Sequence, residues 1–234
     1  EIADRRLVIP GGVVGLYPAV ADGDDVKVLS DDRGKTRAVL RFLRNQEQKE
    51  RGVPNLSLSD YIAPESTGLT DYIGLFVVTA ALNEAVLEEY KKDDYKHIMI
   101  RILSDRIAEA AAELLHAKVR KEYWGYAPDE NLSPDELFRI QYKGIRPAPG
   151  YPACPDHTEK RIIFALLDAE RNAGAGLTEN FAMTPPATVS GYIFSHPSSS
   201  YFNIGRIGKD QLADYASRKG ITVEEAARWL APNL

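Results

Sequence analysis

The segment 146–155 carries the clearest chemical signal of the sequence. Four of its ten residues are prolines, which push the preceding residues toward extended backbone and leave little freedom to lose when a ligand binds. Proline has no N–H donor, so the segment is not a central strand, and we expect its carbonyl groups to be free for a ligand. Arg146 offers a planar fork for a carboxylate or phosphate, and Gly150 permits close approach. The alternative is a rigid surface loop with an exposed arginine.

A second candidate lies on the longest predicted helix. Arg101, Asp105, Glu109 and His116 fall on one stripe, at spacings of four, four and seven residues. Two carboxylates one turn apart can hold a cation or an ammonium group. The alternative is a solvated helix face with an i,i+4 Arg–Asp pair.

Three further motifs are weaker. Gly34-Lys35-Thr36 is similar to the end of a phosphate-binding loop, but Leu29 stands where that loop needs its first glycine. Cys154 and His157 are two metal-ligand types without partners at zinc spacing, so we predict no metal site. Residues 211–230 predict a helix, a glycine turn and a helix with balanced charges, which favours a packed hairpin over DNA binding.

Composition narrows the function classes. The chain has 234 residues, 29 basic and 34 acidic, so its net charge of −5 argues against a general nucleic-acid binder. Its single cysteine cannot form an internal disulfide, which favours a reducing compartment, the cytoplasm. No apolar run approaches the ~20 residues that span a bilayer, and the first residues do not form a secretory signal, so we expect no membrane association.

The apolar patterns predict an α+β fold, a single domain with a mostly antiparallel twisted sheet and flanking helices. The predicted strands are 13–17, 26–29, 72–79, 188–196 and 201–207. The predicted helices are 35–50, 83–91, 93–122, one that begins with the capping box at 133–136, 156–174, and the hairpin at 211–230 with a cap at Thr222. The inner stripe expected for the long helix is Ile98, Ile102, Ala108, Ala111, Leu115 and Val119.

The sequence RPAPGYPACPDHTEK, at 146–160, closely resembles the signature of the C-terminal activation domain of cobalamin-dependent methionine synthase. The resemblance covers nearly the whole chain from about Gly12 onward, through 71–79, 105–116, 123–133, 189–197 and 228–234. It implies that residues 1–234 form one S-adenosylmethionine-binding activation domain that lacks its N-terminal portion. Family members carry a further segment there, and that segment includes an acidic ligand contact.

The resemblance implies a repair function. When the cobalamin of the synthase falls to the inactive cob(II)alamin state, the activation domain docks over the corrin, which a neighbouring cobalamin-binding domain holds. S-adenosylmethionine then donates a methyl group, and flavodoxin or a flavoprotein reductase donates an electron. The domain belongs to a methyltransferase, yet we expect no turnover from it alone. The two cofactors carry the reactive atoms, so no residue is predicted to be catalytic.

The resemblance also implies a role for individual residues. Arg146 would pair with the carboxylate of S-adenosylmethionine, and Glu109 would meet its positive end. The backbone around Ala148 and Gly150 would satisfy the adenine.

Four more residues complete the implied site. A strand carrying Tyr201 and Phe202 would form the opposite wall of the ligand site. Tyr151 would bind the ligand and face the corrin in the docked state, and Asp105 would lie near the surface that docks to the cobalamin domain.

Two other interpretations remain open. The chain is either a binding domain, as above, or a docking module for flavodoxin and the cobalamin domain that no longer binds S-adenosylmethionine. A more distant interpretation is a DNA-binding regulator that uses residues 211–230.

Overall fold

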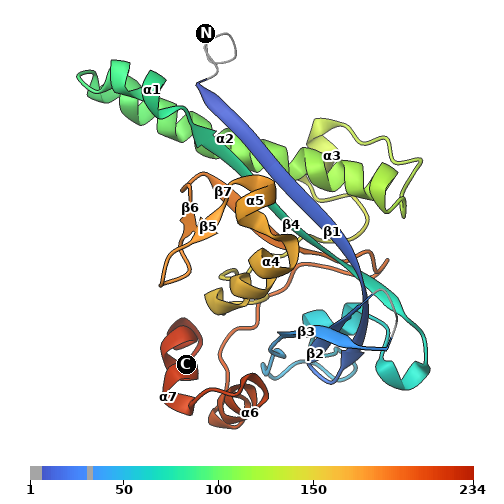
Figure 1. Ribbon diagram of the computed structural model, residues 1–234. Helices are drawn as coiled ribbons and strands as arrows, with labels where there is room; N and C mark the ends of the chain where they lie inside the picture. The colour runs from blue at the N-terminus through green and yellow to red at the C-terminus, as the bar shows by residue number, and fades with distance from the viewer. Residues whose placement is uncertain (1–6, 31–33) are drawn as a thin grey trace.

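A five-stranded antiparallel sheet, in the order β3-β2-β1-β4-β7, runs through the centre of the molecule (Figure 1). The computed structural model describes residues 7–30 and 34–234. The strands are β1 Val8–Asp22, β2 Asp25–Leu29, β3 Thr36–Arg41, β4 Asp71–Leu82 and β7 Thr188–Ile193. A small separate hairpin pairs β5 Gly176–Leu177 with β6 Met183–Thr184. The predicted α+β fold with an antiparallel sheet is confirmed.

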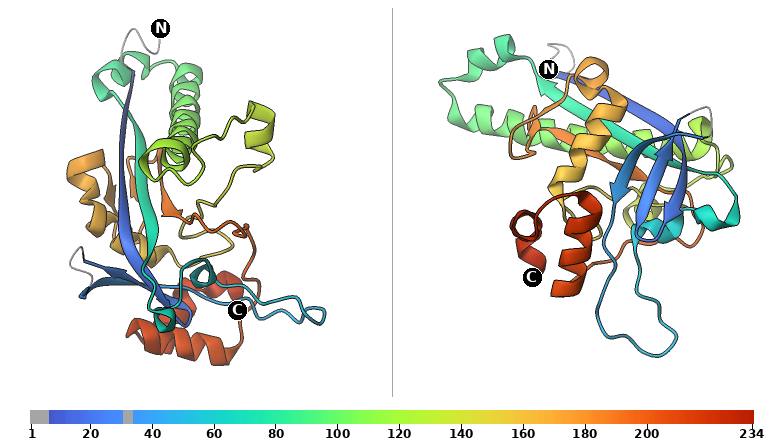
Figure 2. Two further views of the ribbon diagram at one scale, coloured as in Figure 1. Left: turned by 90° about the vertical axis from the view of Figure 1, so that its right-hand side faces the viewer. Right: turned by 60° about the horizontal axis from the view of Figure 1, so that its bottom comes forward.

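Helices cover both faces of this sheet (Figure 2). They are α1 Glu84–Leu87, α2 Asp94–Lys118, α3 Pro134–Phe138, α4 Lys160–Leu167, α5 Ala169–Ala173, α6 Lys209–Lys219 and α7 Val223–Trp229. The long helix α2 lies on one face, α4 and α5 lie on the other, and the α6–α7 hairpin lies at one end (Figure 2). Within the described residues, no helix is both long enough and apolar enough to cross a bilayer.

The side chains of β4 explain why the sheet needs helices on both faces. Leu75 and Val77 are fully buried in the core that contains Ile163 and Phe164 of α4. The intervening Phe76 points to the opposite face and packs in the cluster with α2. A strand that is buried on both sides has a continuous apolar run, as this sequence predicts.

The predicted inner stripe of α2 is correct only in the second half of the helix. Ile98 and Ile102 are 58% and 48% exposed, whereas Ser104 and Ala108 are buried against the sheet. The Ser104 hydroxyl donates a hydrogen bond to the carbonyl of Ala80 on β4. The small side chains of Ser104 and Ala108 let the helix lie close to β4. The face of α2 that carries these small residues therefore points inward, and the face with the larger Ile98 and Ile102 does not.

The predicted helix over 35–50 is wrong. Residues 36–41 form β3, which pairs with β2, and the chain that follows is irregular. Leu40 and Phe42 alternate with more exposed residues and are buried in the sheet core, which is a period of two and not of 3.6. Good helix-forming residues were outweighed by pairing with the neighbouring strand. The Gly34-Lys35-Thr36 motif therefore leads into a strand, and Thr36 is the first residue of β3.

The predicted strand over 201–207 is also wrong. This segment has no regular secondary structure, and Gly205 has a positive φ of 68°. The N–H of Ile204 donates to the carbonyl of Pro152, and that of Ile207 donates to the carbonyl of Asn233. Both isoleucines are buried against the α6–α7 hairpin, which explains the apolar pattern that predicted a strand.

The three capped helix starts read from the sequence, at Ser133, Asp156 and Thr222, are confirmed. Ser133 forms a reciprocal capping box with Glu136. A short turn that Asp156 caps leads into α4, although Asp168 in a left-handed conformation divides the predicted helix before it ends at Gly174. These caps fix the segments that flank residues 146–155.

Replacing Thr222 by alanine is expected to lower the free energy of unfolding by about 1 kcal/mol, because the Thr222 hydroxyl accepts the N–H of Glu225 at 3.1 Å at the start of α7. Urea unfolding measures this change. Thr222→Ser keeps the acceptor and should retain most of the stability. Equal losses in the two variants would show that the cap contributes nothing.

Candidate ligand-binding site

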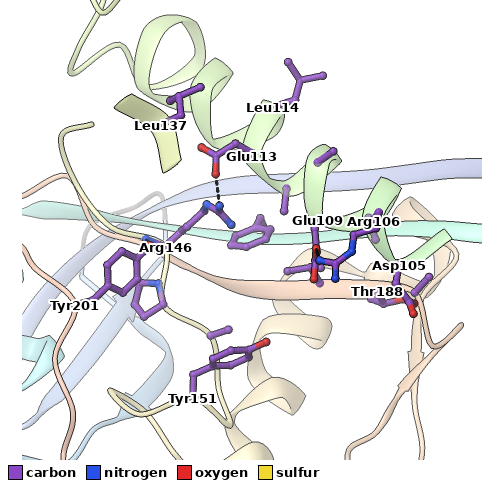
Figure 3. A pocket seen from close by; sticks show the side chains of 18 of the residues that line it. Asp105, Arg106, Glu109, Glu113, Leu114, Leu137, Arg146, Tyr151, Thr188 and Tyr201 are labelled. Atoms are coloured by element: carbon purple, nitrogen blue, oxygen red, sulfur yellow. Dashed lines mark hydrogen bonds and ion pairs between the residues drawn. The ribbon is translucent and has the colours of Figure 1, made fainter. Parts of the chain in front are cut away.

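A pocket of about 1420 Å³ opens along α2, with the segment 146–153 and residues 201–202 opposite the helix (Figure 3). Its contact with α2 runs from Ile102 to Ala117, about 22 Å at 1.5 Å per residue. Ligand pockets commonly measure about 300–1,000 Å³, so this one has room for an elongated ligand.

The pocket has an apolar floor and a polar helix wall. Phe76 of β4 and Val189 of β7 lie at its floor, and Leu137 and Phe138 of α3 lie at its rim. Its polar wall is the row of carboxylates on α2, formed by Asp105, Glu109 and Glu113. Arg146 faces this row from the other side (Figure 3).

Backbone pairing with the outer edge of β7 positions Arg146. Ile145 exchanges two hydrogen bonds of 3.0 Å with Phe194, and the N–H of Tyr192 donates to the carbonyl of Pro147 at 2.9 Å. Neighbouring side chains of an extended segment point to opposite sides. Ile145 is buried in the core, so Arg146 points toward the pocket.

The guanidinium group of Arg146 forms an ion pair with Glu113, through Nη2 and Oε2. Its backbone N–H also donates to the hydroxyl of Tyr201 at 3.0 Å. The sequence analysis missed Glu113. It lies four residues after Glu109 on the same stripe, so the spacing that selected Asp105 and Glu109 was a sufficient signal.

Tyr201, which accepts the backbone N–H of Arg146, is connected to a network of buried polar side chains. The Tyr201 hydroxyl contacts the Tyr142 hydroxyl at 3.4 Å, and the Arg120 guanidinium lies 4.5 Å from the centre of the Tyr142 ring. Arg120 is fully buried and binds Glu130 through hydrogen bonds of 2.7 and 2.9 Å. Burial raises the pKa of Tyr142 well above its usual range, so its hydroxyl stays protonated and available as a donor.

His116 belongs to this network and not to the pocket. It is buried, its ring packs edge-on against Tyr142, and its Nε2 atom lies 3.3 Å from the Tyr126 hydroxyl. Burial, with the charges of Arg120 and Arg146, lowers the pKa of His116 to about 2. The neutral ring therefore has a packing role. Arg101, which shares its predicted stripe, does not line the pocket either.

The pocket brings Asp105 and Glu109 together, as predicted. The carboxylate of Glu109 pairs with Arg106 at 2.7 Å on the exposed surface of the same helix. In Figure 3 this pair lies to the right of Glu113, nearer the N-terminal end of α2, whereas Glu113 faces Arg146. The negative charge of Glu113 is therefore directed at Arg146, and that of Glu109 is not.

The prediction that the carbonyl groups of the proline-rich segment are free is wrong for five of them. Within the segment, the Tyr151 carbonyl accepts the N–H of Cys154 at 3.0 Å, and the Cys154 carbonyl accepts the N–H of Gly150 at 2.8 Å. The Pro147 carbonyl accepts from β7, and the Pro152 carbonyl accepts from Ile204. The Ala148 carbonyl accepts the N–H of Tyr151 at 3.1 Å and the thiol of Cys154 at 2.9 Å. Extended backbone beside a sheet edge finds partners within the protein.

Gly150 has a positive φ of 94°, which favours glycine. A Cβ atom there would also lie 2.1 Å from the His157 ring, so the turn requires glycine at this position. Gly150 itself is not among the residues that line the pocket, whereas Ala148 is.

Cys154 is a buried thiol with a hydrogen bond to the Ala148 carbonyl. Burial raises the pKa of the Cys154 thiol well above its usual range, so it remains protonated. Among residues 7–30 and 34–234, no group of three or more metal-ligand side chains is found.

Three aromatic side chains complete the pocket lining. Tyr151 is 66% exposed at its rim, and Tyr201 and Phe202 lie on the segment opposite α2. Tyr201 and Phe202 therefore line the pocket from an irregular segment and not from the predicted strand, and their contact with a ligand stays a prediction.

The sequence pattern of the vitamin B12-dependent methionine synthase activation domain matches residues 1–220. This chain belongs to that family. Activation domains are part of methionine synthase, an enzyme. In this chain, five of the seven residues of RPAPGYP at 146–152 line the pocket, and Arg146 faces α2.

A solved activation-domain structure agrees in detail. It is described as the MetH reactivation domain bound to AdoHcy and is 51% identical to this chain. The match covers 100% of this chain and 73% of that one, with a TM-score of 0.95. The resemblance read from residues 146–160 is confirmed.

Proposed function

We propose that this activation domain binds S-adenosylmethionine (AdoMet) in the pocket along α2 and supports the reductive methylation of cob(II)alamin. The observation that carries the proposal is the position of Arg146, which is fixed on one wall opposite a row of carboxylates. AdoMet has a carboxylate at one end and positive charge on its ammonium and sulfonium groups, which matches this distribution. The AdoHcy in the 51% identical relative supports the same ligand class.

The residues present fit such a ligand. Arg146 would bind the carboxylate with a charge-assisted hydrogen bond, and Glu109 would face the positive end. Backbone groups around Ala148 and Gly150 would meet the adenine. The carbonyl of Ala148 already accepts two protein donors, and the N–H of Gly150 already donates to the Cys154 carbonyl at 2.8 Å. The adenine contact would therefore depend mainly on the N–H of Ala148.

Tyr201 and Phe202 would cover the adenosine from the opposite side with their aromatic rings. Tyr151 and Asp105 line the pocket with exposed side chains and would face the cobalamin domain when the two domains dock.

Bound AdoMet supplies the methyl group, and one electron from a donor protein balances the conversion of cob(II)alamin to methylcobalamin with release of AdoHcy. The domain contributes binding and orientation, since none of these steps needs a protein nucleophile. Flavodoxin or a flavoprotein reductase is the proposed electron donor, the cobalamin domain of the same enzyme is the proposed docking partner, and the cytoplasm is the proposed compartment.

Arg146→Ala is expected to weaken AdoMet binding about 10–100-fold, since a hydrogen bond between charged groups contributes about 1.5–3 kcal/mol. Calorimetric titration of the purified chain measures this change. Arg101→Ala is the matched control, because Arg101 is an exposed arginine of the same helix that does not line the pocket, so its loss should leave the affinity unchanged.

Equal affinities of wild type and Arg146→Ala would contradict the site. A wild-type chain without affinity for AdoMet would instead favour the docking module, which a pull-down of the cobalamin domain or flavodoxin, insensitive to AdoMet, would support.

A further inference from the structure

The ion pair between Glu113 and Arg146 is incompletely satisfied. Glu113 Oε2 contacts Arg146 Nη2, but Glu113 Oε1 and Arg146 Nε are both buried and, among the described residues, have no hydrogen-bond partner. One acceptor and one donor are therefore left unpaired in the same ion pair, on the wall of the pocket. Buried polar atoms without a hydrogen-bond partner are rare in proteins, so a ligand that supplies the missing hydrogen bonds is expected to bind here.

The group that satisfies both atoms must carry an acceptor and a donor close together. An α-amino-carboxylate has this property, because its carboxylate accepts hydrogen bonds and its ammonium group donates them. Glu113 is 30% exposed at its side chain and lies on a helix surface, so rotation about its side-chain bonds can turn its unpaired oxygen into the pocket.

The spacing of Glu109 and Glu113 along α2 is comparable to the separation of the two positive charges of AdoMet. Glu109 and Glu113 are one turn apart, about 5–6 Å between their Cβ atoms. The ammonium and sulfonium groups of AdoMet are separated by two methylene groups and the α-carbon, a comparable reach. Glu113 faces Arg146, which would hold the neighbouring carboxylate, so the ammonium group falls to Glu113 and the sulfonium group to Glu109.

We infer that Glu113 is a specificity-determining residue, which accepts a hydrogen bond from the α-ammonium group of the ligand while Arg146 binds the carboxylate. This inference rests on the proposed function. Glu113 and Arg146 would together bind the amino-acid end of the ligand. Ligands without the α-amino group should therefore bind more weakly. A residue that only held Arg146 in place would not distinguish such ligands.

The test compares two ligands on two proteins. The ligands are AdoHcy and its analogue in which hydrogen replaces the α-amino group, and the proteins are wild type and Glu113→Gln. For wild type, removal of the amino group should weaken binding about 10–100-fold, the effect of one charge-assisted hydrogen bond. For Glu113→Gln, the same removal should change the affinity less than about threefold. Glu109→Gln, one turn away, should retain the wild-type discrimination.

The outcomes separate the inference from the proposed function. A similar discrimination in wild type and Glu113→Gln would overturn the role of Glu113, even if both proteins bind AdoHcy. An unchanged wild-type affinity for the analogue would overturn it without any variant. Wild type that binds neither AdoMet nor AdoHcy would overturn the proposed function itself. As a further check, 5′-methylthioadenosine, which lacks the amino-acid end, should bind wild type and Glu113→Gln equally.

Discussion

Replacing Arg120 by methionine is expected to lower the free energy of unfolding by about 3–5 kcal/mol, the usual cost of removing one partner from a buried ion pair. Arg120 is fully buried, and the Glu130 side chain is only 9% exposed. Methionine fills much of the space but leaves the Glu130 carboxylate buried without its positive partner. The midpoint of urea unfolding, at an unchanged slope, measures the loss.

Arg120→Met combined with Glu130→Leu is the decisive control. A buried pair that is replaced by apolar groups of similar volume often costs little, so the double variant should recover most of the stability. A double variant as unstable as Arg120→Met would show that the packing of Arg120 on Tyr142, and not its charge, holds this region together.

Replacing Gly191 by alanine is expected to destabilise the domain by about 2–3 kcal/mol and to weaken AdoHcy binding about tenfold. A Cβ atom at Gly191 would lie 2.5 Å from the backbone oxygen of Pro147, which cannot rotate away as a flexible side chain does. The segment 145–147 would have to shift away from β7, and Arg146 would move with it. Thermal unfolding and calorimetric titration measure the two effects.

Gly12→Ala is the matched control for this prediction. Gly12 lies on β1 in the same sheet, and its added Cβ would meet a side-chain methyl group of Val78 at 3.2 Å, which is a milder contact. It should cost less stability and leave the affinity unchanged. A Gly191→Ala variant with normal affinity would show that Arg146 is positioned independently of the edge of β7.

The pocket residues that could be predicted from the sequence are those with a local sequence signal. Asp105 and Glu109 follow from helical spacing, and Arg146 follows from its place in an unusual proline-rich motif. The structure brings all three to one pocket. Their individual roles toward a ligand remain predictions.

The errors arose where distant parts of the chain decide the structure. Residues 35–50 have helix-forming composition, yet β2 captures residues 36–41 as a strand. The carbonyl of Pro147 was expected to be free because the sequence does not show that Tyr192 would lie opposite it. Glu113 has only its spacing as a local signal, and its importance appears when Arg146 is placed beside it.

The same backbone that carries Arg146 also covers the C-terminal end of the outer edge of β7, since 145–147 is hydrogen-bonded to Tyr192 and Phe194. When this segment lifts, the amides of Tyr192 and Phe194 lose their partners and β7 becomes an edge on which another chain can add as a strand. A ligand that binds only the closed form shifts the equilibrium away from this opening. Occupancy of the site and resistance to aggregation are therefore linked through one short stretch of main chain.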